Sequence, residues 1–415
     1  MVTVLTHATV FDGTRFLPGT RDVVIDGGRI TSVVEGGQGS HNAGDDYVDC
    51  TGKTIIPGVI DCHVHLTSSG AAESSNFHDP FSLQFFNSVA NMEATLKGGV
   101  TTVRDAGGTD LGAKVAVETG VVRGPRMTIA VNIMSQTGGH GDFHLVSGAD
   151  SPFLAPHPGR PSGVADGLEG VQKKTRELLR AGADHIKICS TGGVLSPRDD
   201  PRHSQFTEAE IAVIVAEAAA QGAAVMSHAQ GAPGIKNAVR AGVRSIEHGI
   251  YLDEEAIDLM LEHGTFLVPT LQAPQAVIKA ADAGAGLPAS VVDKARRVVE
   301  AHQKSITRAH EAGIPIALGT DAGVGPHGEN LEEISLLAEV GLSTTEALAA
   351  GTSIAARLLE NDLVGRLGEG GLADLVVIDG DLRTADVRGI ENRVNAVYLD
   401  GELVLAADRR GTLSG

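Results

Sequence analysis

Cysteine is scarce in this sequence, which has only Cys50, Cys62 and Cys189 among its 415 residues. Three thiols cannot build a disulfide framework, and such low use of cysteine is typical of a reducing compartment. No apolar run approaches the roughly 18 residues that a membrane-spanning helix needs. The first residues also lack the basic and apolar regions of a signal peptide. We therefore expect a soluble, cytoplasmic protein.

Basic residues are also few, because 33 Lys and Arg face 52 Asp and Glu and leave a formal net charge of −19. The phosphates of nucleic acid and anionic membrane surfaces would repel this excess of negative charge, so neither is predicted as a partner. Apolar residues make up 42% of the chain. This content suffices for a large buried core and argues against disorder.

Both ends of the chain are predicted to form short strands. Near the N-terminus, apolar segments flank an Asp26-Gly27-Gly28 turn, a pattern typical of a hairpin. The same pattern returns at residues 373–381 and 394–406. The sequence therefore predicts one small β-sandwich domain, built from residues 1–53 and residues 361–415.

Between these ends, in residues 54–360, apolar strands alternate with helices that start at capping boxes such as Thr207–Glu210 and Ser343–Glu346. The eight predicted strands cover residues 54–61, 100–106, 126–133, 185–189, 223–229, 244–248, 265–270 and 314–321. Eight strand–helix units over about 270 residues match an α/β fold of the (β/α)8 TIM-barrel type. A doubly wound open sheet is the alternative, but no Gly-x-Gly-x-x-Gly opens a helix after the first of these strands.

Residues that can bind metal fall at the ends of these strands. The first strand runs into His63 and His65, which are two positions apart, so both imidazoles can face one metal ion. Lys187 lies in the apolar fourth strand, where desolvation makes a charged amine costly. It could form a buried salt bridge. A neutral Lys187 could instead react with carbon dioxide to form a carbamate, which bridges two metal ions as a carboxylate does.

Three further strands end in similar residues: His228 in the fifth, His248 in the sixth and Asp321 in the eighth. Taken singly, each histidine could be a packed core residue, and Asp321 could be a helix N-cap. Together with the first three, they place six candidate ligands at the carboxyl ends of strands, where barrel enzymes keep their active sites. We predict a binuclear metal site. Zn²⁺ suits these ligands best, although Mn²⁺, Fe²⁺ or Co²⁺ could use the same set.

With these residues the sequence resembles the amidohydrolase superfamily. The resemblance rests on PGVIDCHVH, GVTTVRDAG, the lysine of the fourth strand, the two later histidines, GTDAG and GRLGEGGLADLVVIDGD. More narrowly, the sequence is similar to the imidazolonepropionase-related branch, which includes Xaa-Pro dipeptidases (prolidases), Arg/Lys-type carboxypeptidases and ochratoxinase-like hydrolases. The resemblance implies that His63, His65 and Asp321 bind one metal ion and that His228 and His248 bind the other.

The same resemblance implies that Lys187, carboxylated by CO2, bridges both ions, and that the protein is a homo-oligomer. A Gly-Gly-His-Gly loop helps to hold substrate in this branch, and here it contains His140. Many relatives place a second His or a Tyr shortly after the fifth-strand histidine, whereas this chain has Ala229-Gln230-Gly231. Gln230 could supply the substrate contact, or the substrate could differ.

The residues predict a hydrolase with a small-molecule substrate. Two divalent cations that share a water lower its pKa from 15.7 to about 7, and Asp321 could carry its proton to the departing nitrogen. The resemblance, and its Gly-Gly-His-Gly loop in particular, implies cleavage of the C–N amide bond of a dipeptide or an N-acyl amino acid, with His140 bonded to the substrate. The alternatives are a cyclic amide, carbamate or lactone hydrolase with the same site, and a non-catalytic scaffold, which should lack ligands.

Two charged neighbours, Arg104 and Asp105, end the second predicted strand. A structural ion pair between them is the favoured interpretation, and assistance to the metal site is the alternative. Cys62 and Cys189 adjoin predicted ligands, and we interpret them as buried thiols rather than nucleophiles.

Overall fold

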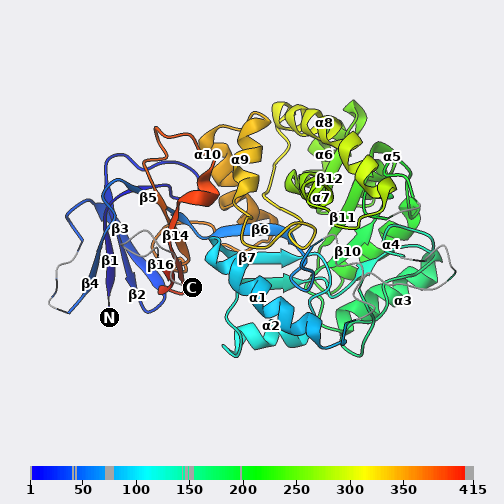
Figure 1. The fold of residues 1–415 in the computed structure, drawn as a ribbon, viewed down its shortest axis with the longest axis horizontal. Helices are drawn as coiled ribbons and strands as arrows, with labels where there is room; N and C mark the ends of the chain where they lie inside the picture. Colours follow the sequence, from blue (N-terminus) through cyan, green and yellow to red (C-terminus); the bar gives the residue numbers. More distant parts are fainter. Residues whose placement is uncertain are drawn as a thin grey trace.

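The structure is a computed structural model that describes residues 2–39, 42, 44–70, 79–142, 144, 148, 154–196 and 199–406. Residues 407–415 of the predicted C-terminal β segment lie outside the described residues. Strands from the two ends of the chain gather at one end of the molecule, and the helices and remaining strands form the rest (Figure 1).

The terminal strands hydrogen-bond into one mixed sheet of eight strands in the described residues, in the order β16-β15-β14-β5-β1-β2-β3, with β4 beside β1. These strands are β1 (Thr3–Val10), β2 (Arg21–Asp26), β3 (Arg29–Glu35), β4 (Asp46–Asp49), β5 (Lys53–Pro57), β14 (Leu375–Asp379), β15 (Val394–Leu399) and β16 (Glu402–Ala406). Val23 of β2 and Tyr398 of β15 belong to one buried cluster, although four strand pairings separate them along the sheet. Strands from both ends of the chain therefore share one sheet and one buried cluster.

The predicted strand 54–61 is in fact two strands that meet at Gly58. Residues of β5 pair with β14 and β1 in the terminal sheet, whereas β6 (Val59–Val64) pairs with β7 (Val100–Asp105). A Cβ on Gly58 would lie 2.1 Å from the Thr101 side-chain oxygen, so the chain can change sheets here only because glycine has no side chain.

The other strands form two parallel sheets in the described residues, ordered β6-β7-β8 and β13-β12-β11-β10-β9. Their remaining members are β8 (Arg126–Ile129), β9 (Ile133–Met134), β10 (Ile186–Cys189), β11 (Val225–Gly231), β12 (Ser245–Tyr251) and β13 (Phe266–Val268). The strand predicted at 126–133 is thus split into β8 and β9. Nearly all of these residues are buried, as in parallel sheets covered on both faces.

The eighth predicted strand, 314–321, does not form a regular strand. It makes one parallel bridge, between Ile316 and Leu267. Its backbone nevertheless reaches both sheets, because Ala317 donates to Leu267 of β13 while Cys62 of β6 donates to Leu318. This segment connects the edges of the two parallel sheets and places Asp321 beside the end of β6.

Helices follow most of the parallel strands and pack around them (Figure 1). Their bounds are α1 (Leu83–Lys97), α2 (Leu111–Glu118), α3 (Gly167–Arg180), α4 (Glu208–Ala219), α5 (Ala232–Arg240), α6 (Glu254–His263), α7 (Gln272–Asp282), α8 (Ala289–Ala312), α9 (Glu332–Glu339), α10 (Thr344–Ala350), α11 (Ser353–Leu358) and the 3-10 helix Ile390–Arg393. Both predicted capping boxes are present, on α4 and α10. None of the helices in the described part of the chain combines the length and hydrophobicity that spanning a bilayer requires.

Candidate metal centre

A cavity of about 400 Å³ opens at the carboxyl ends of the parallel strands. Its lining contains every residue that the sequence analysis assigned to the site: His63, His65, His140, Lys187, His228, Gln230, His248 and Asp321. These side chains come from six separate segments of the chain, between positions 63 and 321. The fold therefore brings all of the predicted site residues to one place.

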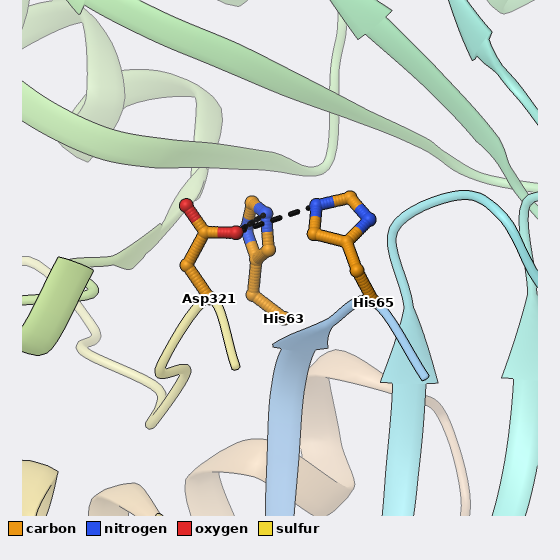
Figure 2. A group of neighbouring side chains, drawn as sticks. All are labelled: His63, His65 and Asp321. Carbon is orange, nitrogen blue, oxygen red and sulfur yellow. Dashed lines mark ion pairs between the residues drawn. The ribbon is translucent and has the colours of Figure 1, made fainter. Parts of the chain in front are cut away.

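Three of these side chains converge on one point. His63, His65 and Asp321 each offer a ligand atom, and these atoms lie within 4.8 Å of one another. Asp321 Oδ1 lies 3.5 Å from His63 Nε2 and 3.3 Å from His65 Nε2 (Figure 2). No hydrogen-bond partner for the buried Asp321 Oδ1 is found among the described residues. Buried carboxylate oxygen and imidazole nitrogen that face one another in this way form a suitable divalent-metal site.

The other ring nitrogen of each histidine is held by the protein. His63 Nδ1 donates to Glu247 Oε2 at 2.8 Å, and His65 Nδ1 donates to the Gly107 carbonyl at 2.7 Å. Because both acceptors lack a proton to give, each Nδ1 carries a hydrogen, and each Nε2 is turned toward Asp321 Oδ1. Burial lowers the pKa of His63 well below its ordinary value, which keeps it neutral. Neutral imidazole is the form that binds metal.

His228 and His248 are prepared in the same manner. His228 Nε2 donates to the Gly192 carbonyl at 3.0 Å, which leaves Nδ1 unprotonated. The Thr270 hydroxyl donates to the Pro269 carbonyl, so it accepts from His248 Nδ1 at 2.7 Å and leaves Nε2 unprotonated. Burial lowers the pKa of both imidazoles well below the ordinary value. The ring centroid of His248 lies 4.6 Å from that of His228 and 5.2 Å from that of His63.

Lys187, on β10, lines the same cavity as these histidines. Its Nζ is 3.4 Å from His63 Nε2, and the residue is only 2% exposed. Burial lowers the pKa of the amine, which favours its neutral form. A neutral amine is the form that can add CO2. The chemistry and position of Lys187 thus fit a bridging carbamate between the two groups of ligands.

The backbone at two of these residues is strained. His248 and Asp321 have φ angles of 73° and 59°, in the left-handed region that residues with a side chain seldom adopt. Asp61 of β6 helps to hold the Asp321 turn, because its Oδ2 accepts from Thr320 Oγ1 at 2.7 Å and from Asn330 Nδ2 at 2.8 Å. Such strain persists only where the surroundings enforce it, and it is frequent at functional sites.

Arg104 assists the site through a partner other than the one expected. It pairs with Glu247 at 3.0 Å and donates to the Cys62 carbonyl at 2.7 Å. Asp105 instead accepts from backbone N–H groups that include those of Leu66 and Gly107. The favoured ion pair between Arg104 and Asp105 is therefore wrong. The sequence analysis did not identify Glu247, because a glutamate before His248 carries no signal of its own. Its role arises because β12 lies near β6 and β7, which carry His63 and Arg104.

His140 is held by a network on the loop after β10. Ser196 Oγ donates to the Asp199 carboxylate and accepts from His140 Nδ1 at 2.7 Å. Lys294 of α8 fixes this loop by donating to the carbonyls of Gly193, at 2.6 Å, and of Ser196. The His140 ring stacks on His228 with centroids 4.2 Å apart. Nε2 of His140 is therefore the ring atom left to contact a ligand in the cavity.

Two further residues of the lining have contrasting roles. Gln230 is 4% exposed, and its Oε1 has no hydrogen-bond partner among the described residues, while its backbone N–H donates to Thr191 Oγ1 at 2.9 Å. An unpaired buried oxygen is available to a ligand. Cys189 also lines the cavity, but burial raises the pKa of its thiol to about 12, so it stays protonated. It is a buried free thiol, as are Cys50 and Cys62.

Comparison with known proteins decides the family. Residues 54–404 match the family model described as "Amidohydrolase family". The chain belongs to the amidohydrolase family. It is therefore a metal-dependent hydrolase that acts on carbon–nitrogen bonds, with a metal-binding group formed by His63, His65 and Asp321.

Several known proteins are similar to the chain over most of its length. Ochratoxinase from Aspergillus niger is 33% identical over 344 residues, which cover 78% of this chain and 70% of ochratoxinase. The solved structure of a prolidase in complex with N-methylphosphonate-L-proline is 39% identical, with a TM-score of 0.87 over 97% of this chain and 99% of the prolidase. A Xaa-Pro dipeptidase with methionine bound in its active site is 34% identical, with the same TM-score and the same coverage of each chain.

Proposed function

We propose that this amidohydrolase cleaves the C–N amide bond of a dipeptide or an N-acyl amino acid. The observation that carries the proposal is the gathering of His63, His65, Lys187, His228, His248 and Asp321 around one cavity. The relatives support the substrate class, since a prolidase and a Xaa-Pro dipeptidase are named for linear dipeptides and have amino-acid-like ligands bound.

The proposed cofactor is a pair of divalent ions, with Zn²⁺ best suited to the ligands. His63, His65 and Asp321 would hold one ion, and His228 and His248 the other. Lys187, carboxylated by CO2, would bridge them. The orientation of the four imidazoles, each held by the protein through one ring nitrogen, supports this assignment, as do the unpaired Asp321 oxygen and the buried Lys187.

When bound, the two ions would supply an activated water and polarise the scissile carbonyl. Asp321 is the proposed proton carrier between that water and the departing nitrogen, since its Oδ1 faces the cavity without another hydrogen bond. His140 is the proposed contact to the substrate through Nε2. Gln230 is a second proposed contact, because its amide oxygen is unpaired and lies in the lining.

We also propose that the region predicted as residues 54–360 forms one closed (β/α)8 barrel that begins at β6, since β5 belongs to the terminal sheet, and in which the segment from Pro315 to Ala322 takes the place of the eighth strand. Its backbone bonds to β13 and β6 support this closure. The segments predicted as residues 1–53 and 361–415, together with β5, would form the β-sandwich domain, in which the single mixed sheet folds over their shared buried cluster. We also propose a cytoplasmic location, which the three free cysteines support. The proposed assembly is a homo-oligomer.

The test combines metal analysis with hydrolysis. Protein reconstituted with zinc and bicarbonate is assayed on a library of dipeptides and N-acyl amino acids, and the released amino acid is measured. About two metal ions per chain together with release from Xaa-Pro, Xaa-Arg or N-acyl substrates would support the proposal. Two ions without release would refute the linear-amide assignment and favour a cyclic amide, carbamate or lactone. A chain that binds no metal would refute the catalytic assignment of the six ligands.

A further inference from the structure

One side of the cavity is lined by apolar side chains. We call it the apolar wall, and it consists of Val194, Leu195, Ile250, Ala273, Val277 and Val324. They come from the loop after β10, the end of β12, helix α7 and the segment after Asp321. Apart from Leu195, none of them is more than 9% exposed. They project into the same cavity as the candidate metal ligands.

Helix α8 supports this wall from behind. Val291, Ala295 and Val298 of α8 belong to the same hydrophobic cluster as the wall, and none of them is more than 2% exposed. Interiors packed in this way resist collapse into an adjoining cavity. The shape of the wall is therefore set by the folded protein and does not depend on a ligand.

The wall offers no partner to a charged group. Among the described lining residues, the charged side chains other than histidine are Lys187, Asp321 and Asp142. The first two belong to the candidate metal centre, and Asp142 accepts from the Gly138 N–H on the His140 loop. Two polar side chains also line the cavity: Thr270 Oγ1 bonds to the His248 ring, and His302 bonds to the His248 carbonyl through Nε2, while its buried Nδ1 has no partner among the described residues.

We propose that the apolar wall binds an apolar side chain of the substrate and rejects a charged one. The inference rests on the proposed function, because it specifies which dipeptides or N-acyl amino acids that site accepts. A charged side chain there would lose its water without gaining an ion pair, whereas leucine, methionine or phenylalanine would bury apolar surface. Ala273 and Val277, one turn apart on α7, are small and leave the space that such a side chain fills.

The test compares two substrate series, N-acetyl amino acids with a varied residue and Xaa-Pro dipeptides with a varied first residue. In at least one series, kcat/KM for Leu, Met and Phe should exceed that for Lys, Arg, Asp and Glu by about 10²-fold or more. Val277→Phe should fill the space and shift preference from Phe toward Ala by about tenfold. The matched control is Ala283→Phe, which enlarges an exposed residue at the end of α7 outside the cavity lining and should leave the preference unchanged.

Binding of free leucine, phenylalanine, lysine and glutamate to the zinc-loaded protein is measured in parallel by calorimetry. Tighter binding of the apolar pair, weakened by Val277→Phe, would support the wall even if no linear amide were hydrolysed. The absence of hydrolysis would then overturn the proposed function alone. Hydrolysis of charged and apolar substrates at similar rates in both series would overturn the inference and leave the proposed function in place.

Discussion

Replacing Glu247 by glutamine should weaken both the fold and the metal centre. Glu247 is fully buried, and its two oxygens accept from three side chains: His63 at 2.8 Å, Arg104 at 3.0 Å and Ser245 at 2.5 Å. An amide has one acceptor oxygen and one donor group. Glutamine therefore cannot serve all three donors, and it leaves the Arg104 charge buried without a counter-ion.

The size of the expected stability loss follows from the burial of the Arg104–Glu247 ion pair. The Arg104 side chain is 6% exposed, so water cannot replace the lost carboxylate. Breaking a buried ion pair by removing one partner costs about 3–5 kcal/mol, and we expect a loss of this order in the free energy of unfolding. Loss of the carboxylate that orients His63 should also weaken metal affinity by about 10–100-fold.

The assay is urea unfolding of the metal-free protein at pH 7, together with zinc titration against a competing chelator. The control is Glu262→Gln on the exposed end of α6, which should change the free energy of unfolding by less than about 0.5 kcal/mol. The double variant Glu247→Leu with Arg104→Met should recover part of the stability, because it removes both charges. A Glu247→Gln protein with the stability and zinc affinity of the wild type would refute this reasoning.

Three other perturbations have defined outcomes. Lys187→Ala should lower the metal content below two ions per chain, and added acetate or propionate should restore part of the activity; unchanged metal content and rate would refute the carbamate. Asp321→Asn should retain at least one ion but lose about 10²–10⁴-fold in kcat, and near-normal turnover would remove Asp321 from proton transfer. Burial raises the pKa of Glu333 from 4.5 to about 8. Because the folded-state pKa is the higher one, the stabilising contribution of Glu333 is complete below pH 4.5 and is lost as pH rises through 8. The free energy of unfolding, measured with urea, should therefore fall more between pH 5 and pH 9 in the wild type than in Glu333→Gln. Equal decreases would contradict the raised pKa of Glu333.

Local patterns predicted most of the elements and the side chains that gather in the cavity. The capping boxes of α4 and α10 lie within four residues, so their chemistry is visible in the sequence and is present in the fold. The apolar segments that flank Lys187 predicted a buried strand, and β10 is fully buried. Strand boundaries were less accurate. The contact between Gly58 and Thr101 splits one predicted strand across two sheets, and these residues are 43 positions apart (101 − 58 = 43).

By itself, the sequence determined the kinds of side chain at the metal centre and their order along the strands, because spacing of two in a strand sets which face a residue occupies. Only the tertiary structure decided what holds those side chains and what surrounds them. Glu247 reaches His63 across 184 positions, and Lys294 reaches the loop that holds His140 across about one hundred. The apolar wall likewise draws its residues from four segments. Such contacts arise when the packed strands and helices bring distant segments together, and no local pattern encodes them.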